Sequence, residues 1–312
     1  MKNNECNKNF NKLLIEHRAD PHIFKHTDGY YYFTATEPDY GYIGLRRSKT
    51  INGLKEEKDT IIWRKHDKGP MSEYIWAPEI HFVNGAWYIY FAAGTTGIDK
   101  DFQIRPYVLE CTDSNPLEGN WVEKGQINIA YDSFALDATT FIHNDTQYLI
   151  WAQTIGETKS NLYISRMSNP WTIETEPVLL SKSDYPWECI GFTVNEGPYI
   201  VVKKDTINLT YSASATDSNY CVGLLTANIN SDLLDAKSWT KSPVPVLATD
   251  DDLGIYGPGH NCFTVAEDGE TTVLVYHART YKTIEGDPLN KPDRHTFKKN
   301  VKWSSDDTVI LK

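Results

Sequence analysis

The sequence predicts an all-β fold, a five-bladed β-propeller, and two observations lead to this prediction. Five short β-rich segments share one pattern of small, acidic and aromatic residues at a nearly constant spacing along the chain. No segment shows the continuous periodicity of an amphipathic helix, whereas Gly, Pro, Asn and Asp interrupt the chain often. A repeat of this length is typical of propeller blades, each of which contributes one small sheet.

Each of the five segments begins with a strand, continues through a turn and returns as a second, aromatic-rich strand. The segments cover residues 19–33, 77–91, 136–151, 195–211 and 258–276. Turn pairs favour the backbone that a tight hairpin requires, so each blade is expected to start with a hairpin. The five pairs are Asp28-Gly29, Asn84-Gly85, Asn144-Asp145, Lys204-Asp205 and Asp268-Gly269.

The outer strands are less distinct than these hairpins. Residues 42–46 and 161–165 are expected to form outer strands, and residues 301–303 and 308–311 are expected to complete the last blade. All-β propellers of this length often form one unit. We therefore predict a single five-bladed propeller, one catalytic domain over residues 1–312, with a β-sandwich of fortuitously similar strands as the alternative.

The charge of the chain argues against a nucleic-acid partner. Its 312 residues include 42 acidic and 31 basic side chains, a formal net charge of -11 at pH 7. An acidic surface repels a phosphate backbone instead of releasing its counterions. No stretch approaches the roughly 20 apolar residues that span a bilayer, so we expect neither nucleic acid nor a membrane as a partner. No pattern in the sequence determines the oligomeric state.

The cysteines and the first residues of the chain predict a compartment. Five cysteines are far apart, odd in number and without metal-ligand spacing, so we interpret them as free thiols. The first ten residues are polar and lack the apolar run of a secretory signal. Both features lead us to expect a cytoplasmic protein. The cysteines are Cys6, Cys111, Cys189, Cys221 and Cys262.

The repeat places three carboxylates in equivalent positions. When the segments are aligned on Phe24 and its counterparts, one position is occupied in turn by residues spaced 58, 59, 59 and 63 apart. Equivalent positions on the innermost strands lie at similar height around a propeller axis, so these residues should converge. Isolated buried charges are costly, so three together indicate a functional site; an ion-pair network or a cation site is the alternative. The five residues are Asp20, Pro78, Asp137, Glu196 and Gly259.

Three converging carboxylates fit the chemistry of glycoside hydrolysis. This reaction needs a general acid that protonates the leaving oxygen, and a second carboxylate that activates water or attacks carbon directly. A third carboxylate nearby would raise the pKa of the acid and keep it protonated near neutrality. Asp20, Asp137 and Glu196 are therefore the predicted catalytic residues, and the chemistry requires no cofactor.

Four motifs resemble those of glycoside hydrolase family 43, and the likeness runs from about residue 18 to the C-terminus. In this order and spacing they are highly specific, although each alone is weak. The resemblance implies an inverting five-bladed propeller enzyme in which Asp20 is the general base, Asp137 the pKa modulator and orienting group, and Glu196 the general acid. The motifs are Ala19-Asp20-Pro21, Trp76-Ala77-Pro78-Glu79, Leu136-Asp137-Ala138 and Val194-Asn195-Glu196-Gly197-Pro198.

The resemblance also implies three neighbours of the carboxylates. His260 matches a histidine near the axis that often helps to hold a water-coordinated, structural calcium ion. Calcium prefers oxygen ligands, so a histidine here can equally hydrogen-bond a carboxylate. Arg294 resembles an active-site arginine that pairs with carboxylate and sugar hydroxyls, with a solvated loop arginine as the alternative. Trp76 would form a wall of the sugar pocket, with core packing as its alternative role.

One motif points to a different propeller family. Trp187-Glu188-Cys189 resembles the Glu-Cys motif of the invertase-like propellers, which are retaining fructosidases. Glu188 lies eight residues before the repeated position, which Glu196 occupies. The Asn-Asp-Pro-Asn-Gly type of opening found in that family is also missing. The invertase-like interpretation is therefore disfavoured.

The presence of the three carboxylates does not identify the substrate, because the family acts mainly on α-L-arabinofuranosides, β-D-xylosides and arabinans with the same three groups. Residues 76–81 and 185–192 most resemble the exo-acting α-L-arabinofuranosidases. We therefore expect release of terminal α-L-arabinofuranosyl residues, with arabinose- or xylose-containing oligosaccharides as partners. A β-D-xylosidase is the first alternative, followed by an endo-arabinanase and a non-catalytic glycan-binding propeller.

Overall fold

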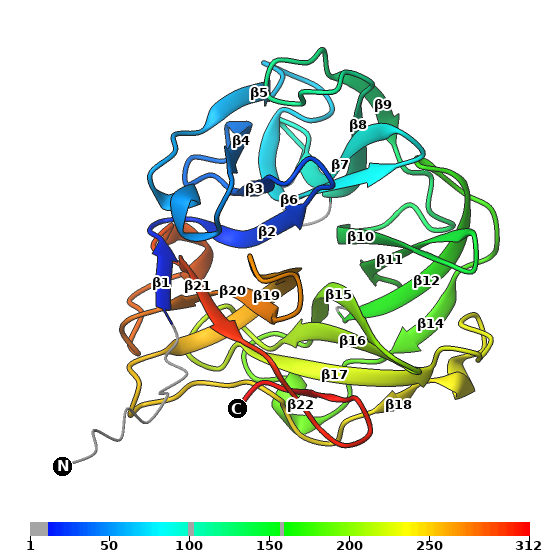
Figure 1. Ribbon diagram of the computed structural model, residues 1–312, viewed down its shortest axis with the longest axis vertical. Coiled ribbons are helices and arrows are strands. Elements are labelled where there is room, and N and C mark those ends of the chain that lie inside the picture. Colours follow the sequence, from blue (N-terminus) through cyan, green and yellow to red (C-terminus); the bar gives the residue numbers. More distant parts are fainter. Residues whose placement is uncertain (1–11, 99–102, 157–158) are drawn as a thin grey trace.

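The computed structural model describes residues 12–98, 103–156 and 159–312, which form five antiparallel sheets around a central axis (Figure 1). The described residues contain no α-helix, and their helical turns are short 3-10 segments. The prediction of an all-β, five-bladed propeller is confirmed. The 3-10 segments are η1 (Asn52–Lys55), η2 (Pro186–Glu188), η3 (Ala236–Ser238) and η4 (Pro288–Asn290).

Each blade begins with a strand beside the axis and continues outward (Figure 1). In the third blade, two short strands both pair with the third strand. The strands of the first four blades are, in order, β2 (Ala19–Lys25), β3 (Tyr31–Thr36), β4 (Tyr42–Ser48) and β5 (Thr60–Arg64); β6 (Glu73–Val83), β7 (Ala86–Gly94), β8 (Arg105–Cys111) and β9 (Val122–Gln126); β10 (Ala135–His143), β11 (Thr146–Thr154), β12 (Ser160–Asn169), β13 (Thr172–Ile173) and β14 (Val178–Ser181); β15 (Asn195–Lys203), β16 (Thr206–Ala213), β17 (Cys221–Asn228) and β18 (Thr240–Lys241).

The fifth blade contains strands from both ends of the described chain. β19 (Tyr256–Val265), β20 (Thr272–Arg279) and β21 (His295–Asn300) are joined by β1 (Lys12–Ile15), which pairs antiparallel with β21. The prediction that the C-terminal residues complete this blade is wrong, because β1 already occupies the free edge of β21. The C-terminal residues instead form a separate hairpin of β22 (Lys302–Trp303) and β23 (Val309–Ile310).

The predicted turn pairs join the two innermost strands of each blade. In the second blade, Asn84 and Gly85 both have positive φ, at 50° and 85°. In the third blade, Asn144 and Asp145 do the same, at 47° and 58°. Two successive residues of this kind give the backbone twist that matches a hairpin, which explains why Asn, Asp and Gly occupy these sites.

Adjacent blades are held together by apolar side chains packed between their sheets. Tyr32 of the first blade packs against Trp87 of the second, with ring centroids 4.7 Å apart, and both side chains are fully buried. Leu45 and Phe91 belong to the same cluster. Burial of such aromatic and aliphatic surface is the main driving force for folding, so most of the aromatic residues serve the packing of the sheets.

Two further properties of the described residues concern membranes and thiols. No helix in the described ranges has the length and apolar character needed to cross a membrane. Cys111, Cys189, Cys221 and Cys262 are free thiols, as expected, and Cys6 lies outside the described residues.

Every innermost strand carries a β-bulge close to the axis. In each, two residues of the strand face one residue of its partner, and one of these two residues has a left-handed backbone. A bulge bends the strand and re-aims side chains, so it brings the beginnings of these strands to the centre of the fold. The left-handed residues are Asp20 (φ 52°), Ala77 (φ 46°), Asp137 (φ 55°), Gly197 (φ 52°) and His260 (φ 40°).

Candidate active site

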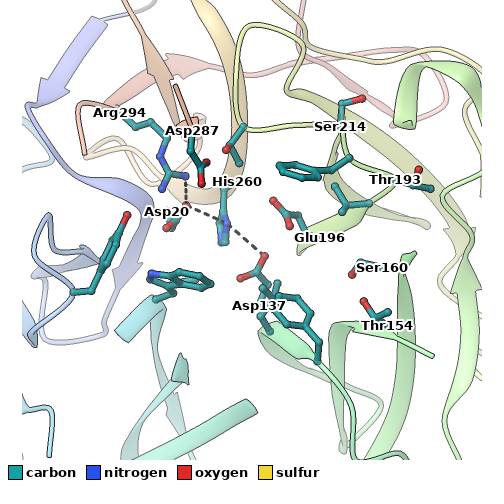
Figure 2. A pocket seen from close by; sticks show the side chains of 18 residues that line it. Asp20, Asp137, Thr154, Ser160, Thr193, Glu196, Ser214, His260, Asp287 and Arg294 are labelled. Carbon is teal, nitrogen blue, oxygen red and sulfur yellow. Dashed lines mark hydrogen bonds and ion pairs between the residues drawn. The ribbon is translucent and has the colours of Figure 1, made fainter. Parts of the chain in front are cut away.

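The bulged strand beginnings surround a cavity of about 460 Å³. Figure 2 shows acidic and basic side chains from separate blades pointing toward one another around it. Every residue that the sequence analysis placed in the site lines this cavity, so the geometry unites positions that are far apart in the chain. They are Asp20, Trp76, Asp137, Glu196, His260 and Arg294.

Asp20 lies among positively charged and hydrogen-bonding neighbours. Thr36 Oγ1 donates a hydrogen bond of 2.5 Å to Asp20 Oδ2, and Arg294 Nη1 lies 3.3 Å from Asp20 Oδ1. His260 Nδ1 also lies 3.3 Å from Asp20 Oδ1. Burial alone would raise the pKa of Asp20, but the positive charges of Arg294 and His260 outweigh it and hold the pKa well below its usual value. Asp20 is therefore ionised at neutral pH.

His277 on β20 is a further neighbour of Asp20, and the sequence did not reveal it. The backbone N–H of Asp20 donates to His277 Nδ1 at 3.0 Å, so this nitrogen carries no proton. Burial and the charge of Arg294 lower the pKa of His277 to about 3, which leaves the ring neutral. No motif in the sequence pointed to His277, which in the structure pairs opposite Gly259 in the fifth blade.

His260 lies between two of the carboxylates. Its Nδ1 is 3.3 Å from Asp20 Oδ1 and 3.7 Å from Asp137 Oδ2 (dashed lines in Figure 2). Burial lowers the pKa of His260, but Asp137, Asp20 and Glu196 raise it above its usual value. A protonated His260 therefore offsets part of the negative charge of the site.

Asp137 and Glu196 form a pair of carboxyl groups that resists full ionisation. Burial raises the pKa of Asp137, and the charges of Glu196 and Asp20 raise it further against the opposing effect of His260. Burial also raises the pKa of Glu196, although Tyr220 donates a hydrogen bond of 2.6 Å to its Oε1 and opposes this shift. The pair therefore holds a proton at a pH where Asp20 is ionised.

Two glycines allow the fourth and fifth blades to approach this closely. A Cβ on Gly197 would lie 3.2 Å from the His260 ring, and the Gly197 N–H donates to Asp137 Oδ2 at 2.9 Å. A Cβ on Gly259 would lie 2.2 Å from the ring of Tyr220. Glycine at these positions therefore lets His260 and Tyr220 reach the carboxylates.

Arg294 and Trp76 both line the cavity. Arg294 is only 8% exposed and contacts Asp20, so it is not a solvated loop residue. Trp76 lines the cavity and packs against Tyr40, with ring centroids 5.8 Å apart in an edge-on arrangement. Phe134 and Phe192 also line the cavity, which gives it an aromatic wall. Such rings suit the apolar C–H faces of a sugar.

The residues around His260 do not build a calcium site by themselves. Calcium takes about six to eight oxygen ligands. Near His260, Asp20 Oδ2 already accepts from Thr36, and Asp137 Oδ2 accepts from the Gly197 N–H. The calcium ion stays a prediction, and the chemistry of the three carboxyl groups does not depend on it.

Glu188, the residue of the invertase-like motif, lies outside the cavity and is fully buried. Its carboxylate accepts hydrogen bonds from Tyr211 and Asn195 and lies 2.8 Å from Lys241 Nζ. These contacts satisfy the buried charge, and they anchor the segment that precedes Glu196. Glu188 therefore has a structural role.

Comparisons with known proteins agree with this geometry. The sequence model described as "Glycosyl hydrolases family 43" matches residues 11–309. A Streptomyces avermitilis protein named extracellular exo-alpha-(1->5)-L-arabinofuranosidase is 54% identical over 301 residues, which are 96% of this chain and 62% of that protein. A Streptomyces chartreusis protein of the same name is 52% identical over 277 residues, 88% of this chain and 84% of that protein. This chain thus spans less than two thirds of the S. avermitilis relative.

A solved structure is similar over nearly the whole chain. The crystal structure of an α-L-arabinofuranosidase from Lactobacillus brevis has a TM-score of 0.94 and 49% sequence identity, and the match covers 97% of this chain and 96% of that chain. A similarity of this extent includes all five blades.

The relatives overturn the prediction of a cytoplasmic protein. Both Streptomyces proteins are named extracellular, which points to secretion, so that prediction is wrong. It depended partly on free cysteines. Because the blades of this propeller are held together by buried apolar contacts, the fold needs no disulfide in an oxidising compartment, and free thiols do not identify a reducing one.

Proposed function

Since this chain belongs to glycosyl hydrolase family 43, we propose that it removes terminal α-L-arabinofuranosyl residues from arabino-oligosaccharides, with inversion at the anomeric carbon. The observation that carries the proposal is the convergence of three carboxyl groups from separate blades on one cavity. Their surroundings differ, because Arg294 and His260 lower the pKa of Asp20 against its burial, whereas burial raises the pKa of Asp137 and of Glu196. The names of the relatives support the choice of arabinofuranosides over xylosides.

Asp20 is the general base of the proposed reaction. Its carboxylate takes a proton from a water molecule while the water oxygen attacks the anomeric carbon on the face opposite the leaving group. Arg294 and Thr36 hold this carboxylate in place and ionised. Because the new C–O bond forms on the opposite face, an α-arabinofuranoside yields β-arabinofuranose.

Glu196 is the general acid. As the glycosidic C–O bond breaks, its electron pair goes to the leaving oxygen, which takes the proton of Glu196. After the reaction Asp20 carries a proton and Glu196 is ionised, and exchange with solvent restores the starting state. Tyr220, which donates to Glu196 Oε1, orients the carboxyl group and stabilises the ionised product state.

Asp137 keeps the proton available to Glu196. Each carboxyl group raises the pKa of the other, because two neighbouring negative charges in a buried site repel. The hydrogen bond from Gly197 and the proximity of His260 hold Asp137 beside the acid. Asp137 is therefore a modulator of the pKa and an orienting group in the proposed mechanism.

The test compares the wild type with Glu196→Gln on two substrates, an arabino-oligosaccharide and an aryl α-L-arabinofuranoside with a nitrophenol leaving group. We expect the variant to lose about 10²–10⁴-fold in kcat on the oligosaccharide and far less on the aryl substrate, because nitrophenolate leaves without protonation. The matched control is Glu123→Gln, which alters an exposed carboxylate paired with His66 and should leave both rates unchanged.

Three results would contradict the proposal. Equal losses on both substrates would remove Glu196 from the role of acid. Preferential cleavage of an aryl β-D-xyloside would indicate a β-xylosidase. Release of short arabino-oligosaccharides but no free arabinose would indicate an endo-acting enzyme. The stereochemistry is read by NMR, where the first anomer formed should be β.

A further inference from the structure

A second cluster of titratable side chains lies farther along the innermost strands, and the proposed reaction does not use it. His22 of β2 and Glu79 and His81 of β6 each offer one ligand atom, and these atoms all lie within 4.8 Å of one another. The three residues are 1%, 7% and 7% exposed, and none of them lines the catalytic cavity. Among the described residues, this is the one group of His, Cys, Asp or Glu with such an arrangement.

The distances within the cluster suit a small metal ion. Glu79 Oε2 lies 2.8 Å from His81 Nε2 and 3.9 Å from His22 Nε2. Zinc bound tetrahedrally at about 2.0–2.1 Å has ligand atoms roughly 3.3 Å apart, and this value lies between the two distances. Small side-chain movements would therefore bring all three ligand atoms around one ion.

The burial of the polar ring of His22 is not explained by hydrogen bonds within the described residues. Both of its ring nitrogens are buried, and neither has a hydrogen-bond partner among the described residues. A buried polar group without a partner destabilises the fold, because it has lost its hydrogen bonds to water. Its nearest aromatic neighbours are the rings of His81 and Tyr199, at 4.9 Å and 5.5 Å between centroids. A metal ion beside Glu79 would give one of these nitrogens a partner.

We propose that His22, Glu79 and His81 bind one divalent transition-metal ion, with zinc as the best fit, and that this ion links the innermost strands of the first and second blades. Two imidazole nitrogens and one carboxylate suit zinc, whereas calcium and magnesium prefer oxygen ligands. Water would occupy the fourth position. The site is distinct from the calcium expected at His260, because it uses other residues. Its role is structural, a cross-link between two blades.

The test uses the full chain after treatment with a chelator, titrated with zinc chloride in a calorimeter. We expect binding of one ion per chain, and Glu79→Gln and His81→Gln should each weaken it by at least about 10-fold. The matched control is His66→Gln. His66 lies 2.8 Å from the carboxylate of Glu123 but belongs to a different part of the surface, where its side chain is 38% exposed, so its loss should leave the affinity unchanged.

Two further measurements separate this site from the catalytic cavity and from misfolding. Glu196→Gln should bind zinc as tightly as the wild type, because the ion does not occupy the cavity. Cobalt bound to the wild-type protein should show the visible absorption of a tetrahedral site, a readout that does not depend on any variant folding. Calcium chloride should not displace the zinc.

The proposal is overturned by any of four results. These are no zinc binding by the wild type, undiminished binding by a His81→Gln variant whose circular dichroism matches the wild type, loss of binding in His66→Gln or Glu196→Gln, and an octahedral cobalt spectrum.

Discussion

Asp20 in the first blade and Glu196 in the fourth occupy equivalent positions in the sequence repeat, yet their surroundings differ. Asp20 faces the guanidinium of Arg294, two histidines and the hydroxyl of Thr36. Glu196 faces the hydroxyl of Tyr220 and lies in a region where burial dominates. The pKa is lowered at the first position and raised at the second.

This difference shows that the repeat determines where each carboxyl group lies, whereas the neighbouring side chains determine its protonation state. The bulges add a geometric difference, since Asp20 and Asp137 lie within their bulges whereas Glu196 lies immediately before its own. The same repeat can therefore supply a base at one position and an acid at another, because the groups that tune them come from other strands.

The largest loss of activity is expected when the general base is removed. Asp20→Asn should lower kcat by about 10²–10⁴-fold on oligosaccharide and aryl substrates alike, because water activation is needed whatever the leaving group. This pattern contrasts with that of Glu196→Gln. Steady-state rates on both substrates check it, and a variant that keeps its rate on the aryl substrate would remove the distinction between the two positions.

The next effect concerns the charge beside the acid. Asp137→Asn removes a neighbouring negative charge, so Glu196 should ionise more readily and the basic limb of the pH–rate profile should move to lower pH, by about 1 unit or more. The control is Asp132→Asn, which removes a carboxylate whose side chain is 87% exposed and should leave the limb in place. An unchanged limb in Asp137→Asn would exclude the modulating role.

Replacing Asp20 and replacing Asp137 should change the free energy of unfolding at pH 7 in opposite directions. The lowered pKa of Asp20 stabilises the fold above the unfolded pKa, and this contribution is lost as the pH falls through the folded value. The raised pKa of Asp137 makes its ionised form costly. Asp20→Asn should therefore lower the free energy of unfolding, and Asp137→Asn should raise it by about 1 kcal/mol. Urea unfolding at pH 7 measures both, and changes of the same sign would contradict the two pKa directions.

A smaller shift is expected when the cation beside Asp20 is removed. Arg294→Gln should raise the pKa of Asp20, so the acidic limb of the profile should move to higher pH by about 1 unit. Arg294→Lys keeps the charge and should leave the limb near its original place. If both variants shift it equally, the geometry of the guanidinium matters more than its charge.

The smallest effect is expected at Tyr220. Tyr220→Phe removes a hydrogen bond that stabilises ionised Glu196, so the pKa of Glu196 should rise and the basic limb should move to higher pH by less than about 1 unit. The direction is opposite to that of Asp137→Asn. A shift of the basic limb to lower pH would show that the hydroxyl of Tyr220 stabilises the protonated form of Glu196 instead.

Local patterns determined much of this fold and of this site. Turn pairs such as Asn84-Gly85 specify hairpins through the backbone of two adjacent residues, so they are readable without any tertiary contact. The nearly constant spacing of the hairpins follows from the size of one blade. Because equivalent strand positions converge at a propeller axis, the same spacing predicts that Asp20, Asp137 and Glu196 meet, as they do in the cavity.

Only the tertiary structure decided which groups surround these carboxylates. His277 contacts Asp20 across 257 positions of sequence, and Tyr220 reaches Glu196 from a loop with no motif of its own. The bulges, the closure of the last blade by β1 and the meeting of His22 with His81 also depend on contacts between separate strands. The sequence by itself therefore determined the propeller and its three carboxylates, and the packing of distant strands decided their protonation, because a pKa responds to charges and burial within a few ångströms in space.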